Sequence, residues 1–202
     1  MLRQDLPNLL ECPVCAAPEL HADAGGGVCC RACGRLFPLR NGILDLHPEP
    51  TESARQEIAA HVTLGENWLE TQVPEHLRPL YAGETGSEIA LAAPRCPFRE
   101  LVDALESVRR IDEIAEDYFE LLDRLGFNGT ETVVEIGAHL GWCARHLSER
   151  AGHVIATDIS PGLEMAGMYL DLGFRFDRVF CDMMVFPFQP EMTEFFRLGR
   201  GT

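Results

Sequence analysis

Residues Thr132 to Asp158 read TVVEIGAHLGWCARHLSERAGHVIATD, and this stretch decides the fold. It starts with a β-branched run that ends in an acid, Glu135, and two glycines follow at Gly137 and Gly141. A helical stretch and a second apolar run come next, and that run also ends in an acid, Asp158. β-branched residues favour strands, and glycine permits tight turns. The pattern therefore predicts a strand, a turn, a helix and a strand, which is one βαβ unit of a parallel sheet.

The two acids are predicted to lie together, because parallel strands end at the same edge of their sheet. That edge is where open α/β sheets bind ligands. At Gly137 the backbone can approach a ligand closely, and Asp158 can accept hydrogen bonds from both hydroxyl groups of a ribose. The stretch therefore favours a nucleoside-containing cofactor. The rival interpretations are a dinucleotide-binding unit and a fold of this kind that binds no ligand.

A third strand is predicted at residues 178–181, which read RVFC and are followed by Asp182 and Met183. Between the second and third strands, Ser160 and Pro161 have the form of a helix N-cap with proline at the first helical position. The predicted sheet thus has three parallel strands, and an acid closes each of them.

Residues 135–141 resemble motif I of the class I S-adenosylmethionine (SAM) methyltransferases. That motif reads roughly acid-x-Gly-x-Gly-x-Gly, and this chain reads EIGAHLG, with His139 in place of the middle glycine. The family also carries an acid after its third strand, as Asp182 is here. A Pro-Phe pair often follows that acid, and Pro187 and Phe188 match it.

The resemblance implies a Rossmann-like sheet that binds SAM. By this resemblance, Glu135 and the glycine loop would hold the methionine end of SAM. Asp158 would bind the ribose hydroxyls, and Asp182 with Met183 would bind the adenine. The cofactor-binding residues that the resemblance implies are Glu135, Gly137, Gly141, Asp158, Ile159, Asp182 and Met183. It gives no catalytic residue, and no general base can be named.

Two Cys-x-x-Cys pairs lie near the N-terminus, Cys12 with Cys15 and Cys30 with Cys33. Two such pairs at this separation predict a structural zinc site in which four thiolates surround one tetrahedral ion. Disulfides or idle thiols are the alternative, which a reducing compartment disfavours. Residues 11–46 resemble the zinc-ribbon module that serves as a small activator subunit of methyltransferases.

Other potential ligands are predicted to lie outside this metal site. Cys29 is a spare thiol beside Cys30, and His21 is a conceivable alternative ligand that is better read as a surface residue. Cys143, His146 and His153 have no partners at ligand spacing, so they are interpreted as core or surface residues.

The sequence divides into three predicted parts: a zinc ribbon at 1–50, a helical or irregular linker at 51–93, and a partial methyltransferase domain at 94–202. The fold class is α/β, with an incomplete Rossmann-like sheet of strands 1–3. Residues 98–125 have an apolar stripe typical of a helix, interpreted as scaffold. In the linker, Trp68, His76 and Tyr81 either contact substrate or, as we favour, pack between the modules.

The family's sheet usually has seven strands, and no β-branched strand follows Phe188. We therefore expect a truncated methyltransferase whose first strand has one bare edge, a hazard for aggregation. A protein partner would cover this edge, or the tail would cover it with Phe195, Phe196 and Leu198.

The predicted function is transfer of a methyl group from SAM to an unidentified acceptor, with activity of this chain in doubt. The alternative is a zinc-ribbon adaptor with a vestigial methyltransferase half, and an NAD-binding fragment is a weaker third. The net charge of −15 counts against RNA as the acceptor and favours a small molecule. No apolar run suits a membrane span and no signal peptide is present, so a cytoplasmic protein is expected.

Overall fold

The computed structural model describes residues 2–18, 20–47, 52, 54–56, 58–59, 75, 106–139, 141–164, 166–189 and 195–196. The chain forms two compact units, one of Met1–His61 with Asn128–Thr202 and one of Val62–Phe127. The first unit contains both cysteine pairs and the main sheet. The linker residues Trp68, His76 and Tyr81 lie outside the described residues, so their roles stay predictions.

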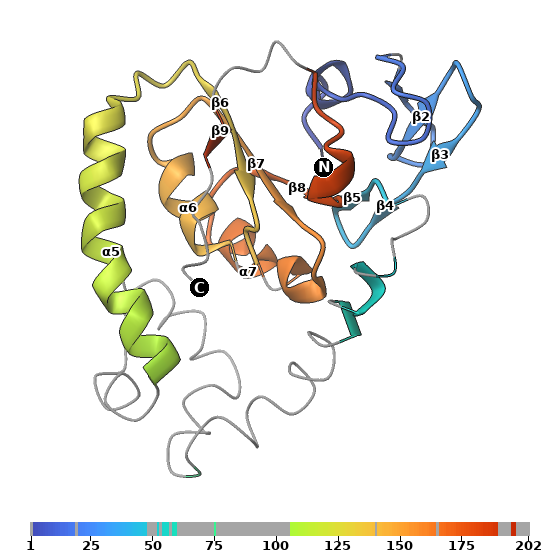
Figure 1. The fold of residues 1–202 in the computed structure, drawn as a ribbon. Helices are drawn as coiled ribbons and strands as arrows, with labels where there is room; N and C mark the ends of the chain where they lie inside the picture. The colour runs from blue at the N-terminus through green and yellow to red at the C-terminus, as the bar shows by residue number, and fades with distance from the viewer. Residues whose placement is uncertain are drawn as a thin grey trace. The chain divides into compact units, whose positions relative to one another are not determined.

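The main sheet has six strands in the order β4-β5-β8-β7-β6-β9 (Figure 1). Its central strands β8, β7 and β6 are the three that the sequence predicted, in the order third, second, first. All neighbours from β5 to β9 pair in parallel, and only β4 with β5 is antiparallel. The mixed α/β sheet agrees with the predicted Rossmann-like class. The strands are β4 (Leu39–Arg40), β5 (Ile43–Asp45), β6 (Thr132–Ile136), β7 (His153–Asp158), β8 (Asp177–Phe180) and β9 (Phe195–Phe196).

Short helices connect these strands. Gly141 precedes the first of them, and Ser160 Oγ accepts a hydrogen bond from Gly162 N at 3.0 Å, which confirms the predicted cap. The helices of this unit are η1 (Leu6–Leu9), α6 (Trp142–Ser148), η3 (Pro161–Glu164), α7 (Gly167–Asp171) and η4 (Met183–Val185).

The described part of the second unit is dominated by α5 (Glu106–Leu125), within the helix predicted at 98–125. Ala115, Tyr118 and Leu122 are buried at the three- and four-residue spacing of one helix face, and Gly126 follows with φ +63°. The helix is thus confirmed over these residues, and its packing against the sheet stays a prediction.

The N-terminal ribbon is a three-stranded antiparallel sheet in the order β1-β2-β3. Pro38 lies between β3, in this small sheet, and β4, in the main sheet. Proline cannot donate to a ladder, so the chain changes sheets at this residue. Asn41 and Gly42 then form the predicted turn, both with positive φ, between β4 and β5. The ribbon strands are β1 (Leu20–Ala22), β2 (Val28–Cys30) and β3 (Leu36–Phe37).

One hydrophobic core joins the ribbon to the main sheet. Leu10 and Phe188 form a β-bridge, and Glu11 N donates to Pro187 O at 2.9 Å. The predicted division at residue 50 stays a prediction, but the two parts pack as one unit. The core residues are Leu6, Leu10, Cys12, Leu20, Val28, Cys30, Phe37, Leu44, Leu46, Val134, Ile155, Val179, Cys181 and Phe188.

The edge of the first predicted strand is paired in the structure. β9 runs parallel to β6, with Val134 opposite Phe195 and Glu135 opposite Phe196. The tail therefore covers part of this edge. Of the two covers that were expected, the tail and a protein partner, this confirms the tail. The stretch after Phe188 has no β-branched run, yet aromatic side chains also favour strands, and two phenylalanines suffice here. Leu198 lies outside the described residues.

A buried pair holds the opposite, amino-terminal edge of the sheet. His153 Nε2 lies 2.8 Å from Asp177 Oδ2, and both side chains are buried. Asp177 Oδ1 also accepts a hydrogen bond from Arg3 N at 3.3 Å, which ties the N-terminal segment to the sheet. His153 is therefore a core residue, as predicted.

We expect Asp177→Asn to lower the free energy of unfolding by about 1–3 kcal/mol, because a buried imidazole loses its charged partner. Urea denaturation followed by circular dichroism measures the change. The matched control is Asp171→Asn, since Asp171 is exposed. Equal stability of the two variants would contradict this role for the pair.

Candidate functional site

The four predicted metal ligands lie together. The Sγ atoms of Cys12, Cys15, Cys30 and Cys33 are all within 4.8 Å of one another. The distances Cys12–Cys33 and Cys15–Cys30 are both 3.7 Å. Zn–S bonds of about 2.3 Å in a tetrahedron place the sulfurs about 3.8 Å apart, so this cluster has the size that a zinc ion requires.

The two cysteine turns have the same backbone design. Cys12 O accepts a hydrogen bond from Ala16 N, and Cys30 O accepts one from Gly34 N, both at 2.8 Å. Ala16 and Gly34 each have positive φ, at 56° and 74°. Each turn therefore presents its two thiols to one point, as a knuckle that binds metal does.

The remaining candidates do not join the cluster. It is the only group of three or more potential metal ligands in the part of the chain that the structure describes. Cys29 and His21 face each other in the β1–β2 pairing and are not members. Cys143, His146 and His153 belong to no such group among the described residues, and their role outside any metal site stays a prediction.

The three predicted acids lie at one edge of the main sheet. In the register of the parallel strands, Glu135 pairs with Ala156 and Asp158 with Phe180. Glu135, Asp158 and Asp182 are therefore at or just beyond the carboxyl ends of β6, β7 and β8. The charges of Asp158 and Asp182 both act on Cys181, and burial together with these charges raises the pKa of its thiol to about 12.

Glu135 is a buried carboxyl group, 4% exposed. Burial, with a smaller contribution from Asp158, raises its pKa to about 8, although hydrogen bonds from Cys143 and the Ala144 backbone oppose the shift. Its Oε2 atom has no hydrogen-bond partner among the described residues. A cation beside this group would favour its ionised form, so the position suits a positively charged ligand.

This pKa makes stability depend on pH. The pKa of 4.5 expected for an unfolded Glu135 lies below the folded value of about 8, so ionisation opposes folding. The contribution of protonated Glu135 to the free energy of unfolding is fully present below about pH 4.5. It declines as the pH rises and is lost above about pH 8. We expect Glu135→Gln to gain stability over the wild type across this window, by at most about 1.4 kcal/mol per pH unit. Urea titrations at several pH values measure the difference, and a constant difference would contradict the assignment.

Asp158 holds the glycine loop. Its Oδ2 accepts a hydrogen bond from His139 N and its Oδ1 accepts one from Ser160 N, each at 2.7 Å. The side chain is 6% exposed. Each carboxylate oxygen can accept a further hydrogen bond, so a ligand hydroxyl can still be bound.

The substitution of histidine for the middle glycine of the motif now has a structural account. Gly137, His139 and Gly141 all have positive φ, at 76°, 46° and 75°. His139 therefore adopts a conformation that favours glycine, and its hydrogen bond to Asp158 supports it. Its ring lies against Gly162, where an added Cβ would come within 2.8 Å of the ring.

Gly141 and Gly137 meet different constraints. A Cβ on Gly141 would lie 2.6 Å from the Ala166 Cβ, so the helix start packs closely here. A Cβ on Gly137 would meet nothing within 4 Å. The described residues therefore leave space beside the backbone at Gly137.

The adenine side of the predicted site is more exposed. Asp182 is half-buried and caps η4, accepting a hydrogen bond from Met184 N at 2.9 Å. Met183 is 48% exposed, and Ile159 is half-buried directly after Asp158. The structure thus brings all seven residues to one edge, and their binding roles stay predictions.

Sequence reasoning missed one residue at this edge, His47. It follows β5, whose pairing with β8 places Asp45 opposite Phe180. In the sequence it falls within the zinc ribbon predicted at 1–50, and no role was predicted for it. The only local signal was an acid two residues earlier, Asp45, at the end of a short apolar run.

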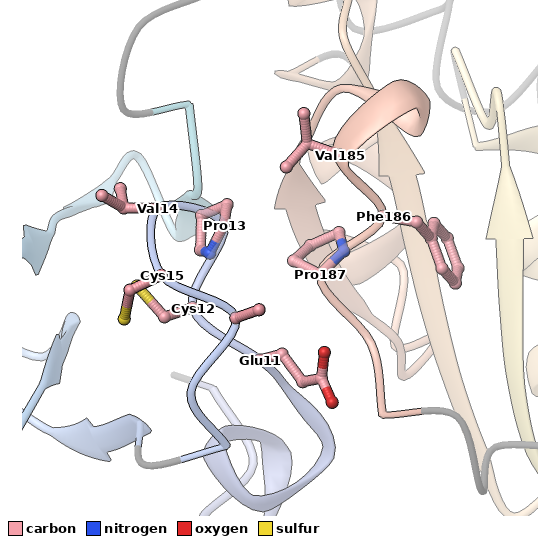
Figure 2. A pocket seen from close by; sticks show the side chains of 9 residues that line it. Glu11, Cys12, Pro13, Val14, Cys15, Val185, Phe186 and Pro187 are labelled. Carbon is pink, nitrogen blue, oxygen red and sulfur yellow. The ribbon is translucent and has the colours of Figure 1, made fainter. Parts of the chain in front are cut away.

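A hollow of about 350 Å³ lies elsewhere, between the first cysteine turn and the segment after Asp182. Figure 2 shows Pro13 facing Val185 and Pro187 across it. Glu135, Asp158 and Asp182 are not part of its lining, so this hollow is distinct from the predicted nucleoside site. It is lined by Glu11, Cys12, Pro13, Val14, Cys15, Ala16, Val185, Phe186 and Pro187.

No model of a known protein family matches the sequence, and no curated protein matches it. Among solved structures, the chain is similar to geranyl diphosphate C-methyltransferase from Streptomyces coelicolor A3(2), solved with Mg²⁺, geranyl-S-thiolodiphosphate and S-adenosyl-L-homocysteine. The sequence identity is 18% and the TM-score is 0.38. The match covers 68% of this chain and 51% of that one, so the chain spans about half the length of that protein.

Among the described residues, no helix combines the length and apolar character that crossing a membrane requires.

Proposed function

We propose that this protein is a SAM-dependent methyltransferase with a structural zinc ion. The observation that carries the proposal is the carboxyl edge of β6, β7 and β8, where Glu135, Asp158 and Asp182 meet a loop with three positive φ angles. These three groups match a ligand that has a positive charge, a ribose and a base. The buried carboxyl of Glu135 would lie near the charge, Asp158 would accept hydrogen bonds from the ribose, and Asp182 would lie near the base.

The residues would divide the cofactor between them. Glu135 would lie by the sulfonium and ammonium charges of the methionine end, and these charges would favour its ionised form. Asp158 would accept hydrogen bonds from the ribose hydroxyls, and Asp182 with Met183 would hold the adenine. When bound, SAM supplies an activated methyl group for in-line displacement. The protein contributes alignment and the exclusion of water.

The acceptor proposed is a small molecule rather than RNA. The excess of acids, with a net charge of −15, disfavours a polyanion. A protein partner at the sheet edge, the three-part division of the chain and a cytoplasmic location remain parts of the proposal.

The four cysteines would hold zinc as a closed structural site. All four positions of the tetrahedron would be thiolates, so no position is left for a water or a substrate. The ion would stabilise the ribbon and, through the shared core, the sheet.

Calorimetric titration of the zinc-loaded protein tests the cofactor. We expect S-adenosylhomocysteine and SAM to bind with a Kd near the micromolar range, about −8 kcal/mol. NAD⁺ should neither bind nor compete, which separates this proposal from the dinucleotide-binding interpretation. Absence of binding by both SAM and S-adenosylhomocysteine would overturn the proposal.

A second candidate function is an adaptor whose methyltransferase half is vestigial. The observation that favours it is a set of exposed apolar side chains on the first cysteine turn and on η4, of which Val14 and Val185 line the hollow in Figure 2. Val14, Met183, Met184 and Val185 are 52%, 48%, 82% and 44% exposed. Exposed apolar groups of this kind mark interaction surfaces. The same titration decides between the two functions, because the adaptor requires no SAM binding.

A further inference from the structure

One side chain of the ribbon segment, that of His47, lies at the edge of the sheet where Glu135, Asp158 and Asp182 lie. β5 pairs with β8, and Leu46 N donates to Phe180 O at 2.9 Å. The next residue, His47, therefore leaves β5 at the same edge at which the chain leaves β7 and β8. Its ring stacks on Phe180, with centroids 6.1 Å apart and planes inclined by 21°. The side chain is 11% exposed.

One nitrogen of this imidazole, Nδ1, lies beside a carboxylate of the protein. Asp45 Oδ1 accepts a hydrogen bond from His47 N at 3.0 Å and lies 3.6 Å from Nδ1. The imidazole also interacts with the Cys181 backbone. Burial lowers the pKa of His47 and so favours the neutral ring, although Asp45, Cys181, Asp182 and Asp158 oppose the shift. A carboxylate beside Nδ1 favours the proton on that nitrogen, which leaves Nε2 as an acceptor.

That acceptor lacks a partner. Nε2 of His47 is buried and makes no hydrogen bond to any described residue. A buried polar atom without a partner costs about 1–3 kcal/mol, and such atoms are rare in folded proteins. The ring stacks on Phe180, two residues before Asp182, so His47 lies near the acid that is proposed to hold the adenine.

We infer that His47 Nε2 accepts a hydrogen bond from the exocyclic amino group of the adenine of the bound cofactor. The inference rests on the proposed function. The zinc ribbon would then take a direct part in the nucleoside site. It supplies strand β5 of the main sheet and, after that strand, His47, which would recognise the base by this hydrogen bond.

The test compares two nucleosides and two histidines. Adenosine and purine riboside differ only in the amino group, and both are titrated into the zinc-loaded wild type, His47→Ala and His21→Ala. His21 is the matched control because it is a half-buried histidine of the same ribbon. We expect the wild type and His21→Ala to bind adenosine about 10-fold or more tightly than purine riboside. His47→Ala should lose most of this preference.

A second measurement uses the unaltered protein, so it holds even if His47→Ala does not fold. Imidazole ¹⁵N spectra should show a shift of His47 Nε2 when adenosine is added, and none when purine riboside is added at saturation. Retention of the full preference by a folded His47→Ala, or no shift with adenosine, overturns the inference. The proposed function survives that result if the wild type still binds S-adenosylhomocysteine. Failure of the wild type to bind S-adenosylhomocysteine overturns both.

Discussion

Removal of zinc is expected to unfold the ribbon and to destabilise the main sheet with it. Structural zinc sites supply folding energy outright, and loss of a structural metal is among the largest single effects on stability. Two of the ligands, Cys12 and Cys30, are 2% and 0% exposed and belong to the core that also contains Val134 and Ile155. Without the ion no metal–thiolate bonds would join the two cysteine turns that carry these thiols.

The cleanest variant is Cys33→Ser. Cys33 is exposed, so the substitution removes one ligand without opening a cavity in the core. Cys29→Ser is the matched control, because Cys29 is also a ribbon cysteine but lies outside the cluster. We expect Cys33→Ser to lose more than about 4 kcal/mol of unfolding free energy and most of its zinc. The control should keep one zinc per chain and wild-type stability.

Zinc content by mass spectrometry and thermal unfolding by circular dichroism measure both quantities. Far-ultraviolet spectra after chelation show whether the sheet is lost along with the ribbon. A Cys33→Ser protein that melts and binds metal as the wild type does would refute a four-thiolate zinc site.

Local signals in the sequence were enough for the central part of the fold. The β-branched run at 132–134, the glycines and the apolar run at 154–157 lie next to one another in the chain, and they predicted β6, the loop and β7. The two cysteine pairs predicted the cluster for the same reason, since each turn is local. His139 is the instructive case, because it stands at a glycine of the motif and the structure shows that it keeps the positive φ of a glycine, which was not predicted from the sequence.

The junction of ribbon and sheet could not be predicted in this way. β5 is three residues long, and a short apolar run has the same pattern whichever sheet it joins. Its partner β8 lies more than a hundred residues away, so the pairing depends on tertiary packing. His47 reaches the site only through this pairing, and for that reason no role was predicted for it from the sequence.

Loss of the Asp158 carboxylate is expected to have the largest effect on cofactor binding. Its two oxygens accept hydrogen bonds from His139 N and Ser160 N, each at 2.7 Å, and these bonds hold the loop beside the ribose position. Hydrogen bonds to a charged group contribute about 1.5–3 kcal/mol each. Asp158→Ala removes both, together with any bond to the ribose. We expect S-adenosylhomocysteine affinity to fall at least about 100-fold, as measured by calorimetry.

A control separates binding from folding. Asp177 is also a buried aspartate, 7% exposed, but it lies at the opposite edge of the sheet. Asp177→Asn should lose stability and keep its affinity for S-adenosylhomocysteine, whereas Asp158→Ala should lose both. Adenosine and 2′-deoxyadenosine then test the ribose itself, because the wild type should prefer adenosine and Asp158→Ala should not. If Asp158→Ala binds S-adenosylhomocysteine as tightly as the wild type does, this carboxylate does not hold the cofactor.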